Sequence, residues 1–286
     1  MSGLETYGIW EQRLAHSASD RGEPFGWWGH RASPTRPLSI VDLMRNGNLD
    51  ARIAAFLWLA MEHRASIVVT STLEDAGKTT LLTALLDFLP PAVETIYLRG
   101  WYERFDFVES KDPNVTYLLC NEISDNLPTY LWGPGVRRLF ETAALGYSLA
   151  TTTHVNDAAG VIDLLTSYPL EVPRRLLSQI DFVLTLGGGS RSSGYLRRLM
   201  RVEMIRNLGD GDGLSVEAIA ERDVLLGPLV TRPGQLIGVL TDRFGMTRQN
   251  ATTQFARREQ FLDQLNRDGI ESAESVRDAI RRFAAR

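Results

Sequence analysis

A short apolar run, a glycine-containing turn and an apolar helix follow one another between residues 66 and 89, and this arrangement narrows the possible folds more than any other feature. The run SIVVTST is rich in β-branched residues and is bounded by turn-forming residues, which predicts a buried strand. LEDAGK predicts a loop, and TTLLTALLDFL predicts a strongly apolar helix that stops at Pro90 and Pro91. A buried strand that leads directly into a buried helix is the repeating unit of α/β proteins with a parallel sheet.

The turn between this strand and helix matches the second half of the phosphate-binding pattern G-x-x-x-x-G-K-[ST] through Gly77, Lys78 and Thr79. In such a loop, backbone N–H groups point at phosphate oxygens, the lysine contacts the β- and γ-phosphates, and the hydroxyl ligates Mg²⁺. We therefore expect a nucleotide with Mg²⁺ to bind here. The residues predicted to bind the nucleotide are Thr72, Asp75, Ala76, Gly77, Lys78, Thr79 and Thr80, with Thr79 also a metal ligand.

The first half of the pattern is altered, because Thr72 stands where the pattern has a glycine that turns without interference from a Cβ. Glu74 and Asp75 also bring negative charge towards a polyphosphate site, which weakens anion binding unless both side chains point to solvent. Two other interpretations therefore stay open. The triplet is a chance feature of a helix N-terminus, or the loop has lost most of its affinity for nucleotide.

The composition of the chain supports a functional role for Lys78. Of 31 basic residues only Lys78 and Lys111 are lysines, so a lysine kept in this arginine-rich chain favours a need for a compact ammonium. The formal charge of −4 gives no bulk argument for nucleic acid or an anionic membrane, although a local basic face stays open. Cys120 is the single cysteine, which excludes an internal disulfide and argues against a multi-cysteine metal site.

The remaining pattern predicts an α/β core over residues 38–230, with an irregular segment at 1–37 and a small helical subdomain at 231–286. In the core, two helices precede the strand at 66–72. Further strands are expected in AVETIYLRG, NVTYLLCNE, YSLATTTH and DFVLTLGGG. Helices are expected in WGPGVRRLFETAALG, DAAGVIDLLTSYPL and VPRRLLSQI, and LRRLMRVEMIRNL reads as either a strand or a helix.

Two of these strands end in titratable residues. Glu122 ends one strand and is the predicted catalytic acid and metal ligand, with Asp125 close behind as a second candidate. His154 ends another and is positioned to sense a γ-phosphate by hydrogen bonding. Ligands of open α/β sheets bind at the carboxyl edge, so we expect these side chains to meet the phosphate loop there. A surface acid and a structural histidine are the alternatives.

The C-terminal stretch TDRFGMTRQNATTQFARR also has the form of a helix-turn-helix, with TRQNATTQFARR as the recognition helix. This makes DNA binding a minor alternative, and helices that pack on the core are the simpler interpretation.

Taken together, these motifs resemble the secretion-type ATPases, which drive type II and type IV secretion, type IV pili and archaeal flagella. The family's Walker B strand ends in Gly-Glu, which Asn121-Glu122 matches in its second residue, and its Thr-x-His-x-Asn box matches residues 152–156. The resemblance covers about residues 38–225. It implies a RecA-like P-loop NTPase core that binds ATP and Mg²⁺ and works as a ring, usually a hexamer.

The chain departs from this family in its Asp box, Glu-Asp-x-x-Glu. Only Glu103 of residues 99–103 matches it, so Glu103 is a third predicted catalytic residue, while Arg99 and Arg104 are possible phosphate contacts. About 40 irregular residues stand where the family has a sizeable N-terminal domain. Because of these changes, a second hypothesis stays open. In this hypothesis the chain is a degenerate family member that assembles with an active paralogue and turns over little ATP.

The resemblance implies further copies of the chain or a paralogous ATPase as partners, together with an inner-membrane platform protein. The first residues lack the pattern of a signal peptide, and no apolar run approaches the ~18 residues of a membrane span. We therefore expect a cytoplasmic protein that reaches the membrane through its partners.

Overall fold

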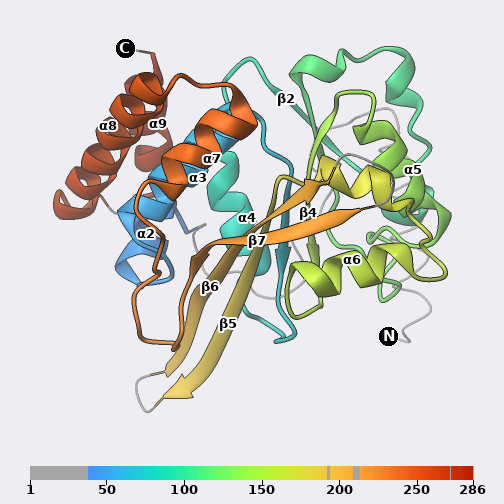
Figure 1. The fold of residues 1–286 in the computed structure, drawn as a ribbon, viewed down its shortest axis with the longest axis horizontal. Coiled ribbons are helices and arrows are strands. Elements are labelled where there is room, and N and C mark those ends of the chain that lie inside the picture. Colours follow the sequence, from blue (N-terminus) through green and yellow to red (C-terminus); the bar gives the residue numbers. More distant parts are fainter. Residues whose placement is uncertain (1–37, 192–193, 209–212, 271, 286) are drawn as a thin grey trace, which may run out of the picture.

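The fold is built on one seven-stranded sheet, with helices on both of its faces (Figure 1). The computed structural model describes residues 38–191, 194–208, 213–270 and 272–285, so the segment predicted to be irregular at 1–37 lies outside the described residues. The strand order is β2-β3-β4-β1-β5-β6-β7. The strands are β1 Ile67–Thr70, β2 Glu94–Tyr97, β3 Thr116–Leu119, β4 Ser148–Thr153, β5 Phe182–Arg191, β6 Gly194–Asn207 and β7 Leu214–Glu221.

Strands β2, β3, β4, β1 and β5 pair in parallel, and β6 and β7 continue the sheet in antiparallel fashion. The predicted α/β fold with a mostly parallel sheet and flanking helices is confirmed. All four residues of β1 are buried, as the run of β-branched residues predicted, because β1 lies between β4 and β5 and is covered on both faces. Figure 1 also shows the β5–β6 pair reaching away from the rest of the sheet.

The two faces of the sheet are covered by two sets of helices. Alternation along the strands sorts the side chains: Ile67 and Val69 pack with α2, α3, α4 and the C-terminal helices, whereas Val68 packs with α5 and α6. The helices of the core are α2 Ile40–Arg45, α3 Ala51–Glu62, α4 Lys78–Leu86, α5 Pro134–Ala143 and α6 Ala158–Thr166.

The C-terminal region forms the three predicted helices, α7 Gln235–Phe244, α8 Arg248–Arg267 and α9 Ala273–Ala284. They share one apolar core with α2, α3 and α4. Trp58 of α3 stacks on Phe88 with ring centroids 4.9 Å apart and also contacts rings of α8 and α9. The guanidinium of Arg258 lies over Trp58 and donates two hydrogen bonds, of 2.8 and 2.7 Å, to the carboxylate of Glu62.

Arg258 belongs to the stretch predicted as a recognition helix, and its burial against Glu62 turns it away from any DNA phosphate. DNA binding by this stretch stays a prediction that a gel-shift series over salt concentration would test, because phosphate contacts give a steep salt dependence.

Two local predictions were wrong, and one strand was not predicted. Residues 174–179 form a short 3-10 helix where a helix was expected, and α4 ends at Leu86, before the prolines that were expected to stop it. β7 was not predicted, because half-exposed side chains interrupt its alternation. The ambiguous stretch before it is a strand, β6. None of the helices in the described ranges is long and apolar enough to cross a membrane.

Candidate functional site

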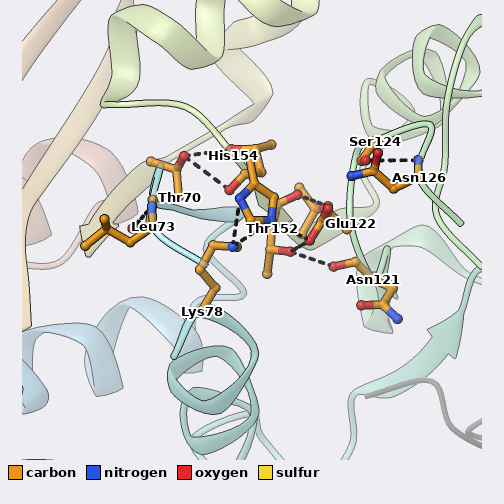
Figure 2. Close-up of polar contacts among 12 residues, drawn as sticks. Thr70, Leu73, Lys78, Asn121, Glu122, Ser124, Asn126, Thr152 and His154 are labelled. Atoms are coloured by element: carbon orange, nitrogen blue, oxygen red, sulfur yellow. Dashed lines mark hydrogen bonds and ion pairs between the residues drawn. The ribbon is translucent and has the colours of Figure 1, made fainter. Parts of the chain in front are cut away.

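The carboxyl ends of β3, β4 and β1 are adjacent in the sheet, and they bring Glu122, His154 and Lys78 together (Figure 2). Lys78 is the first residue of α4, which follows β1 after the loop formed by residues 71–77, called the phosphate loop below. Glu122 follows β3 and His154 follows β4. The expectation that these three side chains meet at one edge of the sheet is confirmed.

The three side chains form a continuous line of polar contacts. The Lys78 Nζ lies 3.0 Å from Nε2 of His154, and the same Nε2 lies 3.3 Å from Oε2 of Glu122. The hydroxyl of Thr152 donates to the backbone carbonyl of Asn121 at 3.0 Å, and it lies 3.5 Å from Oε2 of Glu122. The histidine therefore sits between a cation and a carboxylate, where it can register a change in the position of either.

The ammonium of Lys78 is largely withdrawn from water, since the residue is only 8% exposed. Burial lowers the pKa of Lys78, and the charges of Glu122 and Glu74 oppose this shift without cancelling it. An anion that enters the site would stabilise the charged form of this buried ammonium. Phosphate oxygens would provide that anion, as a P-loop lysine requires.

The N-terminus of α4 has the form of an anion cradle. Gly77 precedes the helix with a left-handed φ of +89° and has no side chain to cap the first N–H groups. Five other α-helices in the described ranges are capped by a side chain at this position, from Ser39, Asp50, Asp157, Thr247 and Ser272. The uncapped amides of α4 thus lie beside the buried Lys78, which suits a phosphate group.

The residues present also fit Mg²⁺, which prefers oxygen ligands and binds through few protein groups together with phosphate oxygens. The hydroxyl of Thr79 makes no hydrogen bond within the described part of the chain, and Glu122, which follows β3, is 7% exposed. These two predicted ligands would share the metal with the nucleotide.

In the altered first half of the phosphate loop, residues 72–75, the left-handed backbone lies at a position that the sequence did not indicate. Asp75, not Thr72, adopts a left-handed φ, of +54°, so the missing glycine imposes no left-handed backbone at Thr72. Aspartate tolerates this region better than most residues. The side chains of Thr72, Glu74 and Asp75 are all exposed, which is the arrangement that limits the repulsion of phosphate. Ala76 is buried and Thr80 is half-buried.

One contact to this loop was missed by sequence reasoning. Nε of Arg197, on β6, donates to the backbone carbonyl of Asp75 at 2.6 Å, and a Cβ added to Gly77 would lie 3.3 Å from Cδ of Arg197. The arginine-rich character of β6 was visible in the sequence, but no local signal linked it to a loop 122 residues earlier.

Glu103 has a role in shaping its own loop. Its carboxylate accepts hydrogen bonds from the backbone N–H groups of Arg99 at 2.9 Å and Phe105 at 2.7 Å, which fixes the turn after β2. Arg99 is buried and Arg104 is exposed.

Asp125, the second candidate acid, is exposed and makes no hydrogen bond or ion pair within the described ranges. Burial raises the pKa of the Cys120 thiol to about 12, so Cys120 stays protonated at neutral pH.

Gly77→Ala is expected to destabilise the protein by about 1 kcal/mol, because alanine is strained at positive φ. It should also weaken nucleotide binding, since the new methyl group meets Arg197 beside the phosphate loop. Gly234→Ala is the matched control, because Gly234 also precedes a helix with a φ of +75° but has open space around its Cβ position. Both variants should lose stability in denaturant unfolding, and only Gly77→Ala should lose nucleotide affinity. Equal affinities would contradict the role of this turn.

Comparisons with known proteins give the following relatives. No protein-family model matches the chain. The uncharacterised protein MJ1287 of Methanocaldococcus jannaschii is 26% identical over 161 residues, which are 50% of this chain and 59% of that protein. The uncharacterised protein MJ0900 of the same organism is 24% identical over 207 residues, 64% of this chain and 36% of that protein. The chain thus spans less than two thirds of the length of either relative.

The solved structures to which the chain is similar include two ATPases. The VirB11 ATPase from the type IV secretion system of Brucella suis, in complex with sulphate, has a TM-score of 0.40 and 20% identity, covering 61% of this chain and 60% of that one. The Legionella pneumophila ATPase DotB has a TM-score of 0.40 and 13% identity, covering 88% of this chain and 67% of that one.

Proposed function

We propose that the chain binds ATP with Mg²⁺ and hydrolyses the ATP as a motor subunit of a type II or type IV secretion machine or a type IV pilus-like machine. The observation that supports this most strongly is the line of contacts from Lys78 through His154 to Glu122, beside the uncapped N-terminus of α4. A lysine at a helix start and an acid at a neighbouring strand end are parts that phosphoryl transfer to water uses. The histidine at the end of the strand between them contacts both.

In this mechanism the N–H groups at the start of α4 and the ammonium of Lys78 hold the β- and γ-phosphates. Mg²⁺, when bound, neutralises charge on the phosphate oxygens, with Thr79 and Glu122 as the protein groups that would hold it. Glu122 polarises a water molecule, whose oxygen attacks the γ-phosphorus. The bond to the β,γ-bridging oxygen breaks, ADP leaves, and the proton of the water passes to the solvent through the carboxylate or the phosphate.

His154 acts as the sensor of the γ-phosphate. The ammonium of Lys78 lies 3.0 Å from Nε2 of His154. A bound phosphate competes for the same ammonium, so occupation of the site changes the surroundings of His154. Because His154 follows β4 directly and precedes α6, this change reaches a helix on the opposite face of the sheet from α4.

The rest of the machine is also part of the proposal. The chain would act as a ring, with a hexamer as the expected form, or together with a paralogous ATPase. It would work on the cytoplasmic side of a membrane and pass its conformational change to an inner-membrane platform protein.

The test uses the full chain in two parallel measurements, phosphate release at saturating ATP and Mg²⁺, and thermal unfolding with increasing ATP. ATP that raises the unfolding temperature and is hydrolysed supports the proposed motor. A chain that neither binds ATP nor releases phosphate would sink the proposal.

A second candidate function is a regulatory or assembly module that binds ATP with little turnover. The observation that favours it is Glu103, whose carboxylate is bound to the amides of Arg99 and Phe105 and is the one residue that matches the family's Asp box. This candidate predicts an ATP-dependent rise in unfolding temperature without phosphate release by the chain alone, and tight assembly with an active paralogue. Robust hydrolysis by the isolated chain would exclude it.

A further inference from the structure

We infer that Thr70 is the positioning residue that keeps His154 in register with Lys78, an inference that rests on the proposed function. Thr70 is the last residue of β1, directly before the phosphate loop, and it is fully buried. Figure 2 shows its side chain directed at the segment that carries His154. The two segments that it joins lie 85 residues apart in the chain.

The hydroxyl of Thr70 makes three hydrogen bonds of 3.1 Å or less to this segment, and it also lies 3.4 Å from the backbone carbonyl of Thr153. It donates to the backbone carbonyl of Val155 at 2.6 Å, and it accepts from the backbone N–H of Val155 at 3.1 Å and from the hydroxyl of Thr153 at 2.9 Å. A hydroxyl has one donor and two lone pairs, so the capacity of this group is fully used. Both polar groups of the Val155 backbone are thus bound by one side chain.

These bonds determine where His154 sits. His154 lies between Thr153, which pairs with Thr70 across the parallel strands, and Val155, whose peptide groups the hydroxyl binds. The backbone on both sides of the histidine is therefore attached to the end of β1, the strand that leads into the phosphate loop and Lys78. The separation of 3.0 Å between Lys78 and His154 depends on this attachment.

The far end of the same segment is attached separately. The carboxylate of Glu203 on β6 accepts a hydrogen bond from the N–H of Ala158 at 3.1 Å, at the start of α6. With α6 held in this way, the path of residues 154–157 is bounded by Thr70 on one side and by Glu203 on the other. Loss of the Thr70 hydroxyl frees only the end that carries His154.

Burial alone does not account for a threonine here. Valine has the same branched shape, and a fully buried strand favours an apolar β-branched residue, as at Val68 and Val69 before it. What distinguishes Thr70 from a valine is its hydroxyl, which binds the backbone of Val155.

The test compares Thr70→Val, which keeps the shape, with Thr70→Ser, which keeps the hydroxyl. In ATP hydrolysis, Thr70→Val should lower kcat by about 10- to 100-fold through displacement of His154, while the KM for ATP changes little because Lys78 and α4 are intact. Thr70→Ser should restore kcat to within about threefold of wild type, since the hydroxyl is retained. Equal kcat values for wild type and Thr70→Val would overturn the inference.

Thr153→Val is the matched control, because it removes one bond to the Thr70 hydroxyl and leaves both bonds to Val155. It should therefore have a much smaller effect on kcat than Thr70→Val. If the two variants lose kcat equally, the two bonds from the Thr70 hydroxyl to Val155 do not position His154, and the inference is overturned. Should Thr70→Val fail to fold, Thr70→Ala provides the same comparison with a smaller side chain.

A second measurement needs no turnover and separates this inference from the proposed function. The ¹⁵N chemical shifts of the His154 imidazole are recorded in the nucleotide-free full chain, with and without Lys78→Met. Removal of the ammonium should shift these resonances clearly in the wild-type and Thr70→Ser backgrounds and far less in Thr70→Val. An equal response in all three backgrounds would overturn the inference even if the chain hydrolyses ATP. The expected pattern would support it even if the chain does not.

Discussion

Lys78→Met is expected to abolish the ATP-dependent rise in unfolding temperature and to lower phosphate release by about 100-fold or more, the usual effect of removing a key contact to the transferred phosphate. When no ATP is added, the variant should keep its stability, because burial disfavours the charged form of Lys78 and lowers its pKa. Thermal unfolding with and without ATP, together with phosphate release, measures both effects.

The lowered pKa of Lys78 also predicts a sign for the dependence of stability on pH. Between the folded-state pKa of Lys78 and its ordinary value of 10.5, the unfolded chain binds the proton and the folded chain does not. Stability of the nucleotide-free wild type should therefore gain from this group as pH rises through that window. Lys78→Met should remove this contribution.

Lys111→Met is the matched control, because Lys111 is the other lysine of the chain and lies at the surface in an ion pair with Glu94. Such exposed pairs contribute about 0–1 kcal/mol, so the variant should bind and hydrolyse ATP like wild type. A Lys78→Met protein that hydrolyses ATP as fast as Lys111→Met would remove the main support for the proposed function.

Glu122→Gln is expected to lower phosphate release by about 100- to 1000-fold while ATP still raises the unfolding temperature. Glutamine keeps the size of the side chain but cannot take a proton from the attacking water. Nucleotide binding should persist, since Lys78 and the N-terminus of α4 are unchanged and one negative charge near the phosphates is lost. Single-turnover phosphate release and an ATP titration separate the chemical step from binding.

Asp125→Asn is the control for Glu122→Gln, because both acids follow β3 but only the carboxylate of Glu122 is buried against His154. The Asp125 variant should hydrolyse ATP like wild type. If Asp125→Asn loses turnover and Glu122→Gln keeps it, the acid of this site has been assigned to the wrong residue.

Local patterns in the sequence predicted much of this architecture. The β-branched run of β1, the Gly-Lys-Thr turn and the apolar helix α4 each depend on neighbours in the chain, so their types could be inferred directly. β7 could not, because its exposed positions break the alternation that reports burial. The left-handed backbone at Asp75 was not predicted either, because no glycine stands at that position to indicate it.

The sequence by itself determined which polar groups stand at the ends of strands, namely Glu122 and His154, and that Lys78 stands between a third strand and a helix. Only the tertiary structure decided which of them touch. The order β3-β4-β1 sets His154 between Lys78 and Glu122, and it brings Thr70 to Val155 and Arg197 to Asp75 across 85 and 122 residues. Residue type and periodicity report burial along one segment, whereas these contacts depend on how separate strands pair, which no single segment encodes.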